Sequence, residues 1–510
     1  ATAAAAGAPA APSDATVVVS GAAAAGGAGA MASSGSAGLA GAAVSGFAGF
    51  AGGCDMGGRF SAARHCPRSR RPRPATARAG RAVRLPAMEI AVVGGGLAGL
   101  VAAWRLAARH RVTLFERLTR PGLAAHGVDI AHGGATLRVD MPLRVYFPGY
   151  YPTLARLYDE LGVASEPVSY ATTFSDEQGR TYFRWRNLRW RDRSWPFVLP
   201  RDLLGARARR IVRGALRFRA AALPALARGE LAGRTLAEFV AAARIEPDFV
   251  DGLLLPAVAT IGTCTLADAA AYPADVVAAY HAGGLARESV RRACGGADEV
   301  AARLLASVQR VVCEAGVTAL VRDAQGVTLH RRGAAAERFD HAVLACAAPQ
   351  ARELMADATA AEDGALAGFR CRPLTVLMHR DAALMPARRA DWSPVHAHVR
   401  AGAERPESTI WINAVQPALR DAPALFQTVQ PLREPRAGTL LAEARFERAL
   451  VDAASERALA QLARLHAEPG RRLWWAGAWA HRGVPLLESA AASALAVAQA
   501  IEAAAPGRAA

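Results

Sequence analysis

The most informative stretch of the chain opens with a short run of apolar, β-branched residues. Residues 89–93 have the composition of a buried strand, and residues 97–108, beyond a glycine-rich turn, carry Ala and Leu at helical spacing. A second apolar run at 111–115 ends in an acid, Glu116. This order predicts a strand, a tight turn, a helix and a second, parallel strand, which together form a unit of an α/β fold.

Farther along, the pattern changes twice. Between residues 150 and 285 the alternation of strand and helix disappears, and helices are expected near 201–228, 235–244 and 247–255. Strands are then predicted at 317–321, 327–330, 339–345, 375–379 and 408–413, and an Ala-rich helix at about 488–503.

We therefore expect two domains, each assembled from separate pieces. The nucleotide-binding domain would comprise residues 88–150, 285–350 and 455–505. The substrate domain, an inserted α+β unit, would comprise residues 151–284 and 351–454.

The turn after the first strand has the spacing Gly94-x-Gly96-x-x-Gly99. Gly94 permits a tight turn, Gly96 lets a pyrophosphate approach the backbone, and Gly99 lets helix and strand pack closely. Glu116 follows Gly94 by 22 residues, where an acid can accept both hydroxyls of a ribose. The alternative is a glycine-rich turn in an ordinary α/β unit, but the full context favours dinucleotide binding.

Composition removes several classes of chemistry. All 61 basic residues are arginine, so no lysine can form a Schiff base or act as a base. The seven cysteines are odd in number and form no C-x-x-C, which argues against a disulfide framework or a zinc site. The formal net charge of +17 comes with no nucleic-acid-binding motif, so we expect no nucleic-acid partner.

Residues 1–87 have the composition of a targeting segment. They are rich in Ala, Gly, Ser and then Arg, contain only the acids Asp14 and Asp55, and include Met31 as a candidate start. This predicts a disordered transit peptide, at 31–87, and a chloroplast or other plastid location. The alternative is a low-complexity tail without a targeting role.

Residues 88–501 resemble the FAD-dependent flavoproteins of the amine-oxidase and phytoene-desaturase superfamily. Besides the glycine motif, Val376-Leu-Met-His-Arg-Asp381 and Ile410-Trp-Ile-Asn413 look closest to its bacterial-type predicted NAD/FAD-binding oxidoreductases. The resemblance implies an α/β fold, with a Rossmann-like FAD-binding domain of the GR2 type assembled from discontinuous segments and an inserted α+β substrate domain. It implies FAD as cofactor, held by Gly94, Gly96, Leu97, Ala98, Gly99, Glu116, Arg117, Val317, Gly477, Ala478, Leu487, Glu488 and Ser489.

Three features depart from that family's pattern. The usual Gly-Gly pair after the ribose acid is replaced by Gly122-Leu-Ala-Ala-His126, and Ala478 stands where many relatives have an acid. The lysine that holds a water against the flavin in many amine oxidases has no counterpart. This last departure argues against simple amine oxidation.

The resemblance also suggests candidates for the chemistry. It places Asp140–Tyr146 along the flavin ring and His379 on a strand that faces the flavin from the substrate domain. Arg144, Tyr146 and His379 are therefore the catalytic candidates, although each has an alternative as a surface or core residue. His396 and His398 share a strand face without a third ligand, so no metal site is expected.

The favoured function is an FAD-dependent oxidoreductase that takes a hydride from, desaturates or isomerises a hydrophobic substrate such as a lipid or isoprenoid. The alternatives are an amine oxidase and a flavin-free, GDI-like lipid carrier. Arginines alternate with apolar residues over 202–228, which fits either a helix at a membrane surface or a basic helix packed on a domain. The sequence does not indicate an oligomeric state.

Overall fold

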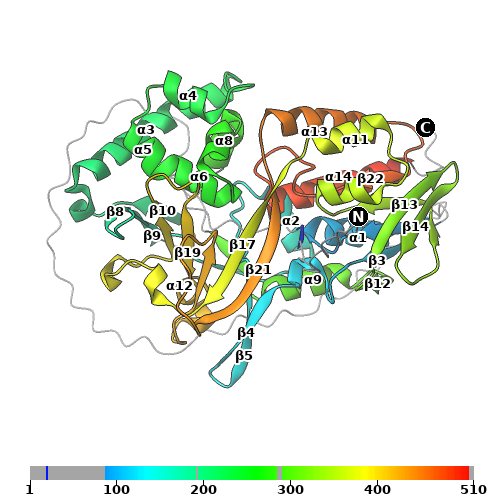
Figure 1. Ribbon diagram of the computed structural model, residues 1–510, viewed down its shortest axis with the longest axis horizontal. Helices are drawn as coiled ribbons and strands as arrows, with labels where there is room; N and C mark the ends of the chain where they lie inside the picture. Colours follow the sequence, from blue (N-terminus) through cyan, green and yellow to red (C-terminus); the bar gives the residue numbers. More distant parts are fainter. Residues whose placement is uncertain (1–18, 21–86, 191–192, 284–289, 505–510) are drawn as a thin grey trace, which may run out of the picture.

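The structure is a computed structural model that describes residues 19–20, 87–190, 193–283 and 290–504 (Figure 1). The predicted transit peptide therefore lies almost entirely outside the described residues, and it stays a prediction together with the plastid location. Within the described ranges, no helix combines the length and the hydrophobicity needed to cross a bilayer.

A five-stranded parallel sheet forms the centre of one half of the molecule. Its neighbouring strands pair in parallel throughout, although they come from three distant stretches of the chain. The fold-class prediction, an α/β unit assembled from discontinuous segments, is confirmed. The strand order is β12 (Arg310–Val312), β3 (Arg111–Phe115), β2 (Glu89–Val93), β16 (His341–Leu344) and β22 (Leu473–Trp475).

Both faces of this sheet are covered, which explains why its strands read as continuous apolar runs. Ile90 and Val92 face α1 (Leu97–Ala107) and α14 (Leu487–Ala504), which pack against each other. Ala91 and Val93 face the opposite core. That side is covered by the antiparallel sheet β13 (Val317–Asp323), β14 (Gly326–Arg331) and β15 (Glu337–Phe339), and by α10 (Ala348–Leu354), α11 (Ala360–Ala367) and α13 (Ala453–His466).

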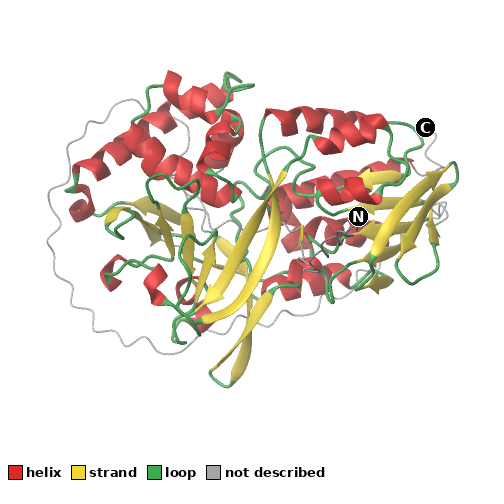
Figure 2. Cartoon of the chain, in the orientation of Figure 1, coloured by secondary structure: helices red, strands yellow, loops and turns green. Residues whose placement is uncertain are grey.

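The other half contains an eight-stranded sheet and a group of helices. Figure 2 shows the two long strands of this sheet running between the helices at the upper left and the half of the molecule on the right that contains the parallel sheet. These two strands are β17 (Cys371–His379) and β21 (Leu440–Ala449), which pair antiparallel. The sheet order is β1 (Val19–Ser20), β21, β17, β20 (Phe426–Val429), β19 (Glu407–Trp411), β18 (Val395–His398), β7 (Thr172–Ser175) and β8 (Thr181–Arg184).

Helices from residues 206 to 282 pack above this sheet (Figure 1). The predicted helical region is confirmed, with a π-helical turn at Val250–Leu254 in its middle. The helices are α3 (Ala206–Ala227), α4 (Leu236–Ala242), α5 (Pro247–Phe249), α6 (Leu255–Gly262), α7 (Leu266–Ala271) and α8 (Ala274–Ala282).

Two predicted strands differ from the structure. The run 339–345 was expected to be one strand, but it divides at Asp340, whose carboxylate accepts a hydrogen bond from Glu89 N at 2.8 Å. The part before Asp340 joins the antiparallel sheet and the part after it joins the parallel sheet. The run 408–413 ends as a strand at Trp411, and a short helix, α12 (Ile412–Val415), follows.

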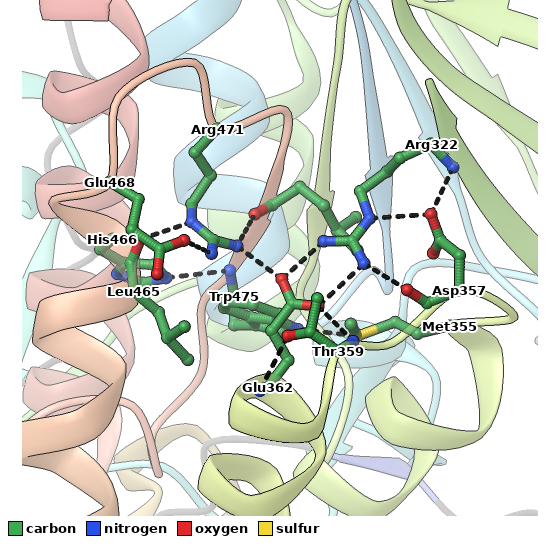
Figure 3. A network of polar contacts seen from close by, with 11 residues as sticks. Arg322, Met355, Asp357, Thr359, Glu362, Leu465, His466, Glu468, Arg471 and Trp475 are labelled. Atoms are coloured by element: carbon green, nitrogen blue, oxygen red, sulfur yellow. Dashed lines mark hydrogen bonds and ion pairs between the residues drawn. The ribbon is translucent and has the colours of Figure 1, made fainter. Parts of the chain in front are cut away.

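A buried carboxylate links the separate pieces of the half that contains the parallel sheet. Glu362 on α11 is 1% exposed and accepts hydrogen bonds from Arg322 of β13, at 2.5 and 2.8 Å, and from Arg471 before β22, at 3.0 Å (Figure 3). Although burial favours its neutral form, these hydrogen bonds lower the pKa of Glu362 to about 2. One ionised side chain thus links three elements that are distant in sequence.

Candidate coenzyme site

The glycine turn between β2 and α1 has the geometry expected of a phosphate-binding turn. Gly94 has φ +109°, and a Cβ there would lie 2.7 Å from Ala345 O. A Cβ on Gly99 would lie 1.8 Å from Gly94 O. Both positions therefore require glycine, the first for its backbone conformation and the second for the close packing of helix on strand.

Helix α1 begins at this turn without a capping side chain. Its N-cap residue is Gly96, no acid occupies its first turn, and Leu97 and Ala98 are its first residues. Its leading backbone N–H groups and the positive end of its dipole therefore face the space beside Gly96, where an anion is stabilised. Gly96 borders two cavities.

The first cavity, of about 290 Å³, lies over the ends of β2 and β3. The predicted residues Gly94, Gly96, Glu116, Arg117 and Val317 all line it. The remaining lining residues are Val93, Gly95, Phe115, Gly316, Cys346, Gln350, Glu353 and Leu354. This mixture of an acid, apolar walls and a glycine turn suits an adenosine group.

Glu116 is held in place by the backbone around it. Its carboxylate accepts hydrogen bonds from Gly95 N at 2.8 Å, Leu118 N at 3.0 Å and Gly122 N at 3.2 Å. A Cβ on Gly122 would lie 3.0 Å from the carboxylate, which favours glycine at this position, whereas Leu123 donates its N–H to Gly95 O at 3.0 Å. The altered sequence after Gly122 therefore leaves this corner of the site intact.

The second cavity joins the glycine turn to the C-terminal part of the chain. Gly96, Leu97 and Ala98 form one wall, and Gly477, Ala478 and Trp479 form another. The remaining lining residues are Ala345, Cys346, Ala347, Cys371, Glu447, Arg448, Ala449, Pro485 and Ala490. Segments more than 350 residues apart in sequence thus border one cleft.

Hydrogen bonds fix the C-terminal wall. Gly477 N donates to Ser493 Oγ at 3.0 Å, and Trp479 Nε1 donates to Cys346 O at 2.9 Å. A Cβ on Gly477 would lie 2.5 Å from Trp479 Nε1, so glycine is required for this packing. Ala478 is thereby turned toward the cleft.

Leu487, Glu488 and Ser489, predicted to meet the flavin ring, border neither cavity. The Glu488 carboxylate accepts from Thr153 N at 3.0 Å and Leu154 N at 2.9 Å, and so caps α2 (Pro152–Glu160). The Ser489 hydroxyl donates to Val484 O at 2.9 Å. From this end of α14, Ala490 faces the cleft instead.

The three catalytic candidates also lie away from both cavities. Tyr146 packs edge-on against Tyr158 in the core, 5.2 Å between ring centres. His379 is fully buried, bonds Thr428 Oγ1 through Nε2 at 2.8 Å and accepts from Asp381 N at 3.2 Å. Both nitrogens are therefore used within the sheet, and His379 is a core residue.

Arg144 is buried rather than facing solvent. Its Nη1 donates to Pro142 O at 3.2 Å, and its Nε has no hydrogen-bond partner among the described residues. Burial lowers the pKa of Arg144, and the negative charge of nearby Asp140 partly offsets this lowering. Asp140 itself accepts from Ala297 N, at 3.0 and 3.1 Å, at the start of α9 (Gly296–Leu305).

The cleft contains residues that the sequence reasoning missed. Cys346 follows β16, and Cys371 and Arg448 lie on the paired strands β17 and β21. Burial raises the pKa of each thiol to about 12, so both stay protonated at neutral pH. The alternation along β21 could have marked Arg448, which shares a face with the buried residues Ala444 and Phe446.

No cluster of three or more His, Cys, Asp or Glu side chains suited to a metal ion occurs in the described part of the chain. His396 and His398 are instead grouped around Ser175 Oγ, at 2.7 and 3.4 Å.

Comparison with known proteins agrees with this geometry. Residues 92–161 match the family model of an NAD(P)-binding Rossmann-like domain. No curated protein matches the chain in sequence. Solved structures match across both halves of the molecule. The chain has the fold of the amine-oxidase-like flavoproteins.

Three of these structures show how far the likeness extends. Cyclohexylamine oxidase from Brevibacterium oxydans IH-35A has a TM-score of 0.55 at 15% identity, covering 82% of this chain and 100% of the oxidase. The CLA-producing fatty acid isomerase from P. acnes has 0.54 at 14%, covering 81% and 98%. Putrescine oxidase bound to putrescine has 0.53 at 13%, covering 82% and 99%.

Proposed function

We propose that this chain is an FAD-dependent oxidoreductase that acts on a hydrophobic organic substrate. The observation that carries the proposal is the continuity of the site. A cavity suited to adenosine, an uncapped helix N-terminus and a second cleft follow one another around Gly96. An extended dinucleotide needs this succession of surfaces.

The residues fit FAD along its length. Glu116 would hold the adenosine ribose, Val317 would border the adenine, and the N–H groups at the start of α1 would hold the pyrophosphate. Gly477 and Ala478 would border the chain that leads to the flavin. The coenzyme would supply a two-electron acceptor, while the protein orients the substrate and excludes water.

Two features support a hydrophobic substrate and a desaturating, isomerising or hydride-transferring reaction. One protein of this fold is a fatty acid isomerase. The cleft offers no lysine, its thiols are protonated and Glu447 is the one carboxylate among the described residues that line it, so a reaction that needs little acid or base catalysis suits it. The amine oxidases of the same fold support the alternative of amine oxidation.

The absorption spectrum of the purified protein tests the proposal. We expect the flavin band at about 450 nm, with close to one flavin per chain, and bleaching of this band by a substrate under anaerobic conditions. A protein that takes up no flavin on reconstitution with FAD, yet binds a lipid, would instead be a flavin-free carrier of the GDI-like kind.

We also propose contact with a membrane surface, but through different residues from those that the sequence pattern suggested. The predicted apolar face of α3 packs inward, since Ala208, Ile211 and Ala215 are buried. The apolar residues exposed nearby are Leu204 and Leu216, at 78% and 64%. If they insert into a bilayer surface, replacing both with Ser should abolish co-sedimentation with anionic lipid vesicles. Unchanged co-sedimentation would exclude this surface.

A further inference from the structure

Arg448 is a buried cation at the boundary between the coenzyme cleft and the inserted helices. It is 3% exposed and lines the cleft together with Ala478 and Pro485. Its Nε donates to Thr263 Oγ1 at 2.8 Å, whereas its Nη2 has no hydrogen-bond partner among the described residues. The Nε–H is therefore satisfied, while Nη2, on the same edge of the guanidinium, is buried without an acceptor.

No acid in the described part of the chain forms an ion pair with Arg448. The ionisable groups that act on it are Tyr272, Tyr151, Cys264 and Cys371. Burial raises the pKa of both thiols to about 12 and the pKa of both tyrosines well above its usual value, so all four are neutral at pH 7. Glu447, next along β21, also lines the cleft, but it forms no ion pair with Arg448, and the charges that act on it are those of Arg117 and Glu353.

The residue that anchors Arg448 is itself held in an unusual conformation. Thr263 ends α6 with φ +49°, in the left-handed region that a β-branched residue rarely adopts. Strained backbone of this kind concentrates at functional sites. The Tyr272 hydroxyl lies close by, 2.7 Å from the position of a Cβ on Gly262, and it also has no hydrogen-bond partner among the described residues.

An unpaired buried guanidinium is costly unless an anion completes it. From this geometry we propose that Arg448 binds the carboxylate of an otherwise apolar substrate, with the Tyr272 hydroxyl as a second donor. The inference deepens the proposed function, because it rests on a coenzyme bound along the same cleft. It also distinguishes substrates that carry a carboxylate from amines, since an ammonium group would be repelled by Arg448.

The same oxyanion chemistry could come from the coenzyme, whose pyrophosphate is anionic. We assign the anion to the substrate because the pyrophosphate already has the uncapped N-terminus of α1 as its site. Arg448 lies instead on the strand that pairs with β17 of the inserted sheet, beside the aromatic residues of the insert.

Binding of decanoate, decanol and decylamine to the purified protein tests the inference. Calorimetry reports binding whether or not flavin is present, and flavin content is read separately from the visible spectrum. We expect decanoate to bind about 10- to 100-fold more tightly than either of the others, as a charge-assisted hydrogen bond provides. Equal affinities, or no binding of decanoate, would overturn the inference even if flavin is bound.

Substitutions test whether Arg448 is the residue responsible for the preference for decanoate. Arg448→Met should remove the preference for decanoate while retaining flavin, and Arg448→Lys, which keeps the charge, should preserve part of it. Arg445→Met is the matched control, because Arg445 lies on the exposed face of the same strand and pairs with Glu443 at 2.8 Å. If Arg448→Met is folded but loses flavin and keeps the preference for decanoate, the anion belongs to the coenzyme and the assignment to the substrate fails.

Discussion

Replacing Glu362 with Gln tests the claim that one carboxylate joins the separate pieces of the nucleotide-binding half. In the folded protein this side chain receives two hydrogen bonds from Arg322 and one from Arg471 (Figure 3). A pKa lowered from 4.5 to about 2 corresponds to about 3 kcal/mol in favour of the ionised, folded form. Gln keeps the shape but removes the charge, so the buried Arg471 and the partly buried Arg322 lose the anion that they share.

We therefore expect Glu362→Gln to lower the free energy of unfolding by about 3 kcal/mol at pH 7, within the range for breaking a buried ion pair. Urea unfolding followed by circular dichroism measures this. Glu468→Gln is the control, because the Glu468 side chain is 56% exposed and bonds only the outer edge of Arg471, so its loss should cost less than about 1 kcal/mol.

The pH dependence supplies a second check. The folded-state pKa of Glu362 is depressed, so its stabilisation is complete above pH 4.5 and disappears as the pH falls toward 2. The difference between wild type and Glu362→Gln should therefore shrink as the pH is lowered below 4.5. A variant as stable as wild type at pH 7, or a difference that grows in acid, would refute the role given to this carboxylate.

Two other predictions concern the glycine turn and the buried histidines. Gly99→Ala should abolish flavin binding, because its Cβ would meet Gly94 O, whereas Gly364→Ala, in open space on α11, should leave the flavin content of the purified protein unchanged. Equal flavin content in the two variants would contradict this reading of the turn. Burial lowers the pKa of five histidines to about 3 or 4, so they stay neutral in the folded protein at pH values where the unfolded chain already binds protons. The free energy of unfolding should therefore have its full value above pH 6.5 and fall by up to about 1.4 kcal/mol per pH unit for each histidine as the pH drops below 6.5. Urea midpoints at pH 7.5 and 5.5 measure this, and an unchanged midpoint would contradict it; the histidines are His281, His341, His379, His396 and His466.

The elements whose signals are local could be predicted from the amino-acid sequence alone. The apolar run, the glycine spacing and the acid at Glu116 predicted a strand, turn, helix and strand that the structure confirms, because each signal lies within about thirty residues. The family resemblance extended the prediction of coenzyme contact to Gly477 and Ala478, which border the cleft.

Which side chains meet could not be predicted in this way, because it depends on how distant segments pack. Arg144, Tyr146 and His379 were chosen for their chemistry, yet all three are buried away from the two cavities, while Arg448 reaches the cleft. The physical reason is that a strand's alternation reports which residues are buried but not what they are buried against. That depends on the packing of β21 against segments nearly 200 residues earlier in the chain, such as the end of α6 at Thr263.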